Sequence, residues 1–372
     1  MNQHPTQRGK TTDPRESVFV LLLLLFCIFL IVFASVTVTR SCAPVEPSTN
    51  TTPLTQSTTG NQTPNDPPES PLVFANGVLP TVLPVETAES AVLDGELTSP
   101  YAVIIDVKNN TVLAGKGADT VMSPASMTKV MTLIVACEAL TEYDLTQRMT
   151  LSEYYNSYDY NGLDKSLIDG TKYLGDTFYI EDLLYGIGVS SAADCVLMIA
   201  ERTYGTLDAF VAEMNRKAEA LGLTQTHFVD AAGDDLAGNT TTAKEMAVIM
   251  TYAMQCRLIR DILSEDAHYF KGYYIKDGVD TDYPRSFQSH LFGDQSSSRI
   301  KRYEEKYGKF TLNTTTGLMG KTGYLDSPDR SYLVCAATGK TTGNAYVVVV
   351  GENTGFADTM KDVKTLFDTY AK

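Results

Sequence analysis

The stretch Ser123–Thr132 reads S-P-A-S-M-T-K-V-M-T, and the folded part of the chain is organised around it. A short polar run with Pro124 near its head leads directly into an apolar run over 130–140. This pattern is typical of a helix that enters a hydrophobic core. Ser126 therefore lies in the first turn of the predicted helix, and Lys129 follows three positions later on the same face.

A serine and a lysine at this spacing can act as a nucleophile and its base. A serine hydroxyl is a weak nucleophile until a base takes its proton, and a buried lysine beside another cation can be neutral enough to do so. Serine with lysine is a known variant of the serine nucleophile. Because S-x-x-K is common by chance, as a capping serine with a solvated lysine, the pair needs support from the rest of the chain.

Length and charge limit the possible partners. With 372 residues, 43% of them hydrophobic, the chain can bury a sizeable core. Its formal net charge of -15 and the lack of a basic cluster exclude nucleic acid as a partner, since phosphate binding needs a basic face. We expect small or peptidic partners.

The N-terminal region has the composition of a membrane anchor. Residues 17–39 contain no charge and would reach roughly 34 Å as a helix, enough to span a bilayer. Three basic residues precede this segment, and between Arg40 and Lys108 there is no further Lys or Arg. The positive-inside rule then makes 1–16 a cytoplasmic tail, 17–39 a single-pass transmembrane signal-anchor helix, and the remainder extracellular at a bacterial cell surface. A cleaved signal peptide is the alternative, although its apolar region is usually shorter.

The remainder divides into a linker and a folded domain. Residues 40–85 are rich in Pro, Thr and Ser, with few large apolar residues, so we expect a disordered tether. The folded domain is predicted to occupy 86–372. A front hairpin, central helices, then antiparallel strands and a last helix indicate an α/β (α+β) fold, in which helices flank both faces of one antiparallel sheet. The elements expected with the clearest patterns are strands at 101–107, 111–114, 317–324, 331–338 and 345–351 and helices at 180–187, 195–202, 206–221 and 242–256.

Two further motifs accompany the Ser126 stretch. Ser191 lies in a polar break between two apolar helical segments, and Lys321-Thr322-Gly323 lies on a predicted strand. S-x-x-K, a second serine motif and K-T-G, in this order, form the motif set of penicillin-binding proteins and class A β-lactamases. From about residue 101 to the end, the chain resembles the low-molecular-mass penicillin-binding proteins of the D-alanyl-D-alanine carboxypeptidase family, which have a β-lactamase-like fold.

The resemblance implies a role for each motif residue. Ser126 would attack the carbonyl between the two terminal D-alanines of a peptidoglycan stem peptide, Lys129 would be the general base, and Ser191 would relay the proton to the leaving D-alanine. Lys321 and Thr322 would bind the substrate carboxylate, and Gly323 would leave room for the peptide beside the strand. The backbone N–H groups of Ser126 and Tyr324 would form the oxyanion hole. No metal or organic cofactor is implied, and β-lactams would acylate the serine.

One departure from the family pattern leaves alternatives open. The second motif is usually Ser-x-Asn, whereas Ala193 stands where the asparagine belongs. A catalytically weak relative that binds wall peptides or β-lactams as a sensor or scaffold is therefore the second hypothesis. A β-lactamase is the third hypothesis, although this sequence offers no clear glutamate as the base for deacylation.

The cysteines and histidines are expected to be structural. Cys137, Cys195 and Cys335 lie in apolar runs and are expected to be buried thiols, and His227 is expected to be structural.

Overall fold

The computed structural model describes residues 72, 74, 83–93, 95–152, 155, 175–234, 238–269, 273–276, 279–282, 286–296, 298–326 and 329–372. All of them belong to Pro67–Lys372, one of two compact units into which the chain divides; the other is Met1–Asp66. The predicted cytoplasmic tail, the predicted transmembrane helix and most of the predicted linker therefore lie outside the described residues. Within the described ranges, no helix has the length and apolar composition to cross a membrane.

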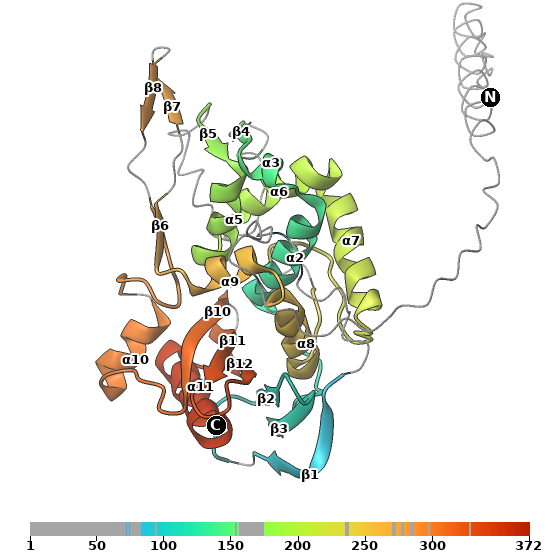
Figure 1. Cartoon of the computed structure of the whole chain (residues 1–372), viewed down its shortest axis with the longest axis vertical. Helices are drawn as coiled ribbons and strands as arrows, with labels where there is room; N and C mark the ends of the chain where they lie inside the picture. The colour runs from blue at the N-terminus through green and yellow to red at the C-terminus, as the bar shows by residue number, and fades with distance from the viewer. Residues whose placement is uncertain are drawn as a thin grey trace, which may run out of the picture. The chain divides into compact units, whose positions relative to one another are not determined.

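A six-stranded sheet forms the centre of this unit, with the strand order β1-β3-β2-β12-β11-β10 (Figure 1). The pairings from β3 to β10 are antiparallel, as predicted, whereas β1 runs parallel to β3. Strand β10 ends the sheet, so one side of its backbone has no neighbouring strand among the described residues. The six strands are β1 (Val85–Val92), β2 (Tyr101–Asp106), β3 (Thr111–Lys116), β10 (Thr315–Asp326), β11 (Asp329–Gly339) and β12 (Ala345–Asn353).

Helices cover both faces of this sheet, because the strands carry apolar side chains on both. Along β2, Val103 and Ile105 pack toward the larger helical layer, while Ile104 packs toward the opposite layer. The larger layer comprises the 3-10 helix η1 (Ala125–Thr128) and the helices α2 (Lys129–Ala139), α5 (Ile180–Val189), α6 (Ala193–Tyr204), α7 (Leu207–Ala220), α8 (Ala243–Ala253) and α9 (Arg257–Ser264). The opposite layer comprises α10 (Arg299–Tyr307) and α11 (Phe356–Tyr370). The predicted helices and strands with clear patterns are confirmed to within a few residues.

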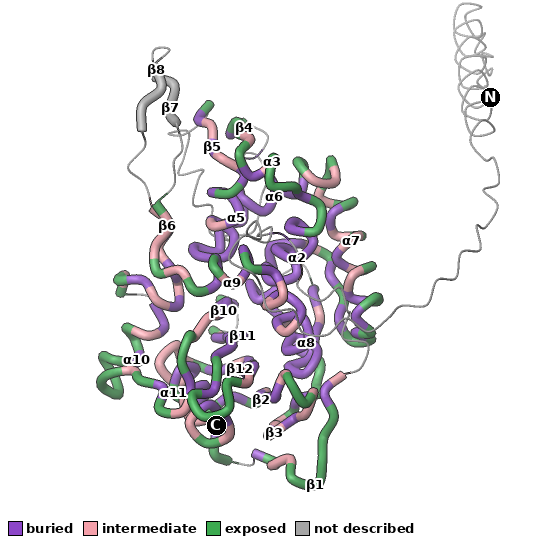
Figure 2. Tube along the Cα trace, in the orientation of Figure 1, coloured by how far each residue is buried: buried purple, intermediate pink, exposed green. Residues whose placement is uncertain are grey.

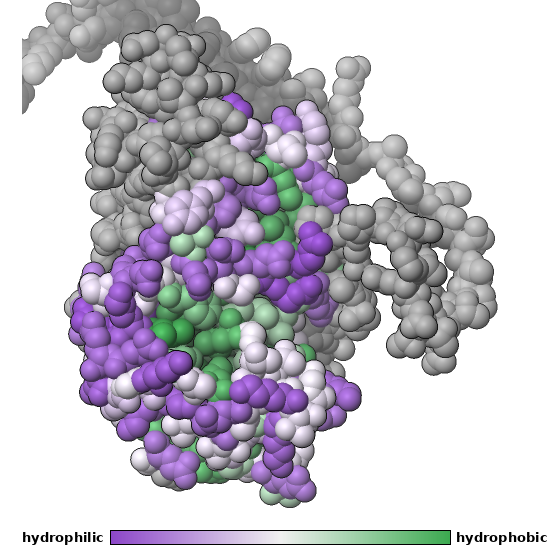
Figure 3. Space-filling view, turned by 60° about the vertical axis from the view of Figure 1, so that its left-hand side comes forward, coloured by the Kyte–Doolittle hydropathy of each residue, from purple (hydrophilic) through white to green (hydrophobic). Residues whose placement is uncertain are grey.

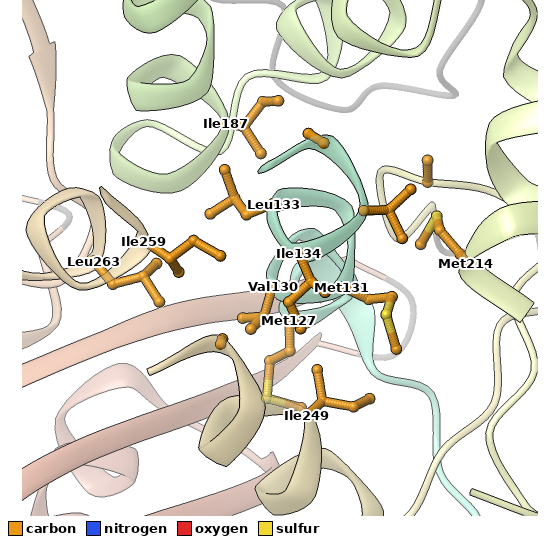
Figure 4. Close-up of a cluster of buried hydrophobic side chains, with 14 of the residues drawn as sticks. Met127, Val130, Met131, Leu133, Ile134, Ile187, Met214, Ile249, Ile259 and Leu263 are labelled. Carbon is orange, nitrogen blue, oxygen red and sulfur yellow. The ribbon is translucent and has the colours of Figure 1, made fainter. Parts of the chain in front are cut away.

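Helix α2 is the buried centre of the larger layer (Figure 2). Every residue from Lys129 to Cys137 is buried, which confirms that the helix after Ser126 enters the core. Apolar side chains from four other helices pack around α2 and the turn before it (Figure 4). These side chains include Ile187, Met214, Ile249, Ile259 and Leu263. The pair Ser126 and Lys129 is thus held at the buried end of α2.

Short elements lie outside these layers. They are α3 (Glu142–Leu145), the four-stranded sheet β4 (Arg148–Thr150), β5 (Thr177–Tyr179), β7 (Tyr273–Lys276) and β8 (Val279–Asp282), and the pair β6 (Ala267–Tyr269) and β9 (Ser286–Gln288). On the face drawn in Figure 3, apolar residues gather in an area bordered by hydrophilic ones.

Two residues of the predicted linker contact the folded unit. Leu72 is buried, and the ring of Phe74 stacks on Tyr252 with 4.9 Å between ring centroids. The backbone of Phe74 also pairs with Cys256. Packing against the domain therefore begins upstream of residue 86.

Candidate active site

Ser126 lies in η1, a single turn that continues directly into α2. Ala125 has a positive φ of 46°, which is unusual for a residue with a side chain and turns the chain sharply before the serine. Two glycines leave room for this turn. A Cβ on Gly233 would lie 2.0 Å from the Ala125 carbonyl oxygen, and a Cβ on Gly323 would lie 3.1 Å from the Ala125 Cβ. The position of Ser126 therefore depends on a loop and a strand that are distant in sequence.

Lys129 is fully buried, and its side-chain nitrogen contacts the serine hydroxyl. The distance from Lys129 Nζ to Ser126 Oγ is 3.1 Å, within the range for proton transfer. Lys129 Nζ also donates to the carbonyl oxygen of Ala232 at 2.6 Å. This second bond fixes the side chain, so that Nζ is already oriented toward Ser126.

The loop that carries Ala232 is organised by Asp230, which sequence reasoning did not single out. The Asp230 carboxylate accepts hydrogen bonds from the backbone N–H groups of Ala232 at 2.5 Å, Gly233 at 2.7 Å and Asp234 at 3.2 Å. Burial raises the pKa of Asp230, whereas these backbone bonds and Lys129 lower it. An Asp followed by Gly three positions later is typical of a turn, and this pattern in the sequence could have marked Asp230 as a loop-forming residue.

Asn239 joins the same loop to the nucleophile turn. Its side-chain oxygen accepts from the backbone N–H groups of Val229 and Asp230, at 2.7 and 3.1 Å, and its amide nitrogen donates to Thr128 Oγ1 at 3.2 Å. His227 is exposed and pairs through its backbone with Thr240, which agrees with the structural role expected for it.

The second and third motifs meet through one hydrogen bond. Lys321 Nζ donates to Ser191 Oγ at 3.0 Å and to the Thr322 carbonyl oxygen at 3.0 Å. Lys321 is buried, and Ser191 has a positive φ of 62° in the short link between α5 and α6. The structure therefore brings together the residues predicted from three separate motifs. A Cβ on Gly323 would contact Ala125 and Tyr332. The lack of a side chain at this position therefore leaves room for η1.

Ala193 begins α6 and is completely buried in the core of the larger layer. Asp194 accepts a hydrogen bond from the backbone N–H of Cys195 at 2.8 Å, in the first turn of α6. A Cβ on Gly186 would lie 2.5 Å from the Cys195 sulfur, so this sulfur packs against α5. Cys137, Cys195 and Cys335 are confirmed as buried free thiols.

Positive charge gathers at this site, although the chain as a whole is acidic. Burial, together with the nearby cations Lys321, Arg299 and Lys129, lowers the pKa of His290 to about 3. The backbone N–H of His290 donates to Val189 at 3.2 Å, and its carbonyl accepts from the N–H of Arg299 at 3.0 Å. His290 therefore stays neutral near pH 7, between the end of α5 and the start of α10. No sequence motif marks His290 or Arg299.

Comparisons with known proteins agree with this geometry. The family model described as D-alanyl-D-alanine carboxypeptidase matches residues 85–277. D-alanyl-D-alanine carboxypeptidase DacF of Bacillus subtilis (strain 168) is 27% identical over 270 residues, which are 70% of this chain and 61% of the relative. D-alanyl-D-alanine carboxypeptidase DacA of Escherichia coli (strain K12) is 30% identical over 183 residues, 48% of this chain and 43% of the relative. The matches thus span less than two thirds of these relatives.

Solved structures establish the fold. The crystal structure of the Streptomyces K15 DD-transpeptidase has a TM-score of 0.59 and 24% identity, over 74% of this chain and 97% of that one. Penicillin-binding protein D2 from Listeria monocytogenes, in its cefotaxime-bound form, has a TM-score of 0.56 and 22% identity, over 74% and 97%. The predicted fold, a sheet flanked by helices as in penicillin-binding proteins, is confirmed.

Proposed function

The chain belongs to the D-alanyl-D-alanine carboxypeptidase family, and from this premise we propose that it removes the terminal D-alanine of peptidoglycan stem peptides through a Ser126 acyl-enzyme. The observation that carries the proposal is the 3.1 Å contact between Ser126 Oγ and the Nζ of a fully buried lysine. A lysine in this position can take the serine proton as the serine attacks.

The reaction would proceed in two stages. Ser126 Oγ attacks the carbonyl carbon of the penultimate D-alanine, and its proton passes to Lys129 Nζ. The intermediate then collapses: the bond to the terminal D-alanine breaks, and the leaving amine takes a proton relayed through Ser191 Oγ. In the second stage, water hydrolyses the ester to release the shortened peptide and regenerate Ser126. Backbone N–H groups of Ser126 and Tyr324 would stabilise the oxyanion, at about 3 to 4 kcal/mol per donor.

The hydrogen-bond pattern supports this division of roles. Lys129 Nζ donates to the Ala232 carbonyl oxygen and contacts Ser126 Oγ, so the bond to Ala232 holds the base next to the nucleophile. Lys321 contacts Ser191 instead, and so can hold the relay hydroxyl in place while adding positive charge. A β-lactam would acylate Ser126 by the same attack, and its slow hydrolysis would leave the enzyme inhibited.

We further propose that the enzyme acts outside the cell, anchored by the predicted transmembrane helix at 17–39. The composition of that segment and the charge pattern around it support this location. The predicted linker would let the domain reach a wall layer beyond the membrane.

A weakly catalytic sensor is the second candidate, because Ala193 cannot orient a substrate amide. Full-length protein and its Ser126→Ala variant should be compared for labelling by a fluorescent penicillin and for release of D-alanine from a diacyl-D-Ala-D-Ala peptide. We expect the native protein to be labelled and to release D-alanine, and the variant to do neither. Loss of at least 10³-fold is expected, because the nucleophile is removed.

The three hypotheses give different results in this experiment. Labelling without D-alanine release supports the sensor, and rapid loss of label with turnover of the penicillin supports a β-lactamase. Labelling that persists in Ser126→Ala contradicts all three.

A further inference from the structure

Cys137 and Cys256 form a pair of buried thiols, although they come from different helices. Cys137 lies near the end of α2, and Cys256 is the N-cap residue of α9. Both are reduced, and their exposed fractions are 1% for Cys137 and 0% for Cys256. A hydrogen bond joins the two thiols. The fold thus brings together two cysteines that are far apart in the sequence.

The packing around this pair holds the two helix ends together. Glu138, the neighbour of Cys137, accepts a hydrogen bond from Tyr252 Oη of α8 at 2.5 Å. The ring of Phe74 stacks on Tyr252, and the backbone of Phe74 pairs with Cys256. Both cysteines are therefore fixed within one packed region, and their contact does not depend on the approach of two surface loops.

The two sulfurs differ in how readily they lose a proton. The hydrogen bond with Cys137 lowers the pKa of Cys256 and outweighs burial, which raises it. The backbone N–H groups of Ile259 and Leu258, in the first turn of α9, also lower this pKa. The same thiol hydrogen bond, together with burial, raises the pKa of Cys137. Cys256 is thus the sulfur that becomes a thiolate, while Cys137 keeps its proton.

A thiolate beside a second thiol is the arrangement in which mild oxidation gives a disulfide. We propose that Cys137 and Cys256 are a modification site at which a peroxide oxidises the two thiols to a disulfide that fastens α2 to α9. The inference goes beyond the proposed function and does not depend on it, because Cys137 lies at the opposite end of α2 from Ser126.

The reaction consumes a single peroxide for each disulfide. The Cys256 thiolate attacks an oxygen of the peroxide, the O–O bond breaks, and the departing hydroxide takes a proton from solvent and becomes water. Cys256 is then a sulfenic acid. The Cys137 sulfur attacks the Cys256 sulfur, the S–O bond breaks, and the hydroxide that leaves takes the Cys137 proton. Two electrons pass from the sulfurs to the peroxide, which is reduced to water.

A small oxidant can approach the pair from the side of Leu72 and Phe74. A cavity of about 430 Å³ is lined by these two residues and by Cys137, together with residues that follow Cys137 in the chain. The cavity thus reaches the hydrogen-bond partner of Cys256. Because both sulfurs are buried, we assign the oxidation to a peroxide, which is little larger than water, and not to a bulky disulfide.

Peptide mapping of the full-length protein tests the proposal. Reduced protein is treated with hydrogen peroxide, unfolded, alkylated with N-ethylmaleimide and digested. We expect Cys137 and Cys256 to lose alkylation together, at least about tenfold faster than Cys335, and a peptide that links them to appear. Cys335 is the matched internal control, because it is equally buried but its pKa is raised by that burial. Dithiothreitol should restore both thiols, since a disulfide is reduced by thiols and a sulfinic acid is not.

Single variants identify the sulfur that reacts first. In Cys137→Ser, the sulfenic acid on Cys256 loses its neighbouring thiol and should persist, so that dimedone traps it. In Cys256→Ser, Cys137 should be labelled by dimedone at least about tenfold less. Cys335→Ala removes a buried thiol outside the pair and should leave the cross-link unchanged. Equal dimedone labelling of the two serine variants contradicts the assigned order of attack.

The effect on stability is measured on the oxidised native protein. A disulfide between these positions closes a long loop, so Tm should rise by about 5 °C on oxidation. An unchanged or lower Tm contradicts the fastening of α2 to α9. A map without the link between Cys137 and Cys256, or oxidation of Cys335 at the same rate, overturns the proposal. The map uses native protein, so it decides the question even if a variant folds poorly.

Discussion

Successive residues of β10 face two different environments. Lys321 and Gly323 point toward Ser191 and the nucleophile turn, whereas Thr322 and Tyr324 point toward the layer that contains α10 and α11. The first face holds its groups by hydrogen bonds and close packing, whereas the layer on the second face contains Arg299, whose buried Nε has no hydrogen-bond partner. One strand at the edge of the sheet thus presents two different environments, simply because its side chains alternate.

Gly233→Ala should have the largest effect on the first face. Gly233 has a φ of +78°, and an added Cβ would lie 2.0 Å from the Ala125 carbonyl oxygen. We expect the free energy of unfolding to fall by about 1 to 3 kcal/mol from backbone strain alone. The acylation rate should fall about 10²-fold, because the turn that positions Ser126 must move. Chemical denaturation and penicillin labelling measure the two effects.

Gly205→Ala is the matched control for this substitution. Gly205 has a similar φ of +79°, but no atom lies within 4 Å of an added Cβ. It should cost stability by about 1 kcal/mol and leave the acylation rate unchanged. Equal effects of the two substitutions on acylation would contradict a specific role for the contact between Gly233 and Ala125.

Thr322→Val tests the second face and should have a smaller effect. The substitution keeps the volume of the side chain but removes the hydroxyl that the family resemblance assigns to the substrate carboxylate. We expect KM for D-alanine release to rise about tenfold with kcat changed less than threefold, since one hydrogen bond to a charged group is lost. Thr322→Ser should retain native KM. A fall in kcat with unchanged KM would place Thr322 with the chemical steps instead.

His290→Gln should have the smallest effect, seen only as a change in the pH dependence of stability. The folded-state pKa of His290, about 3, is below its usual value near 6.5, because the group is buried among Lys321, Arg299 and Lys129. Between pH 6.5 and 3, the unfolded state binds a proton that the folded state does not, so stability falls as the pH is lowered. The drop in Tm from pH 7 to pH 4.5 should be larger in native protein than in His290→Gln. Parallel Tm curves would show that His290 does not contribute.

Much of the fold could be predicted because its signals are local. Thr242, followed by Glu245, predicted the start of α8, and Thr242 does accept a hydrogen bond from the N–H of Glu245 at 3.0 Å. The continuous β-branched run at 345–351 predicted β12. The parallel pairing of β1 with β3 could not be predicted, since register between distant segments has no local signal.

The sequence by itself identified the residues that we propose to supply the chemistry: Ser126 and Lys129 by their spacing of three, with Ser191 and Lys321 named by their motifs. Only the tertiary structure decided how these groups are held and which others join them. Asp230 orients Lys129 through a carbonyl of its own loop, and Arg299 reaches β10 from a helix with no motif. The physical reason is that helical spacing is a property of neighbouring residues, whereas burial, clash and unpaired charge arise only when distant segments pack together.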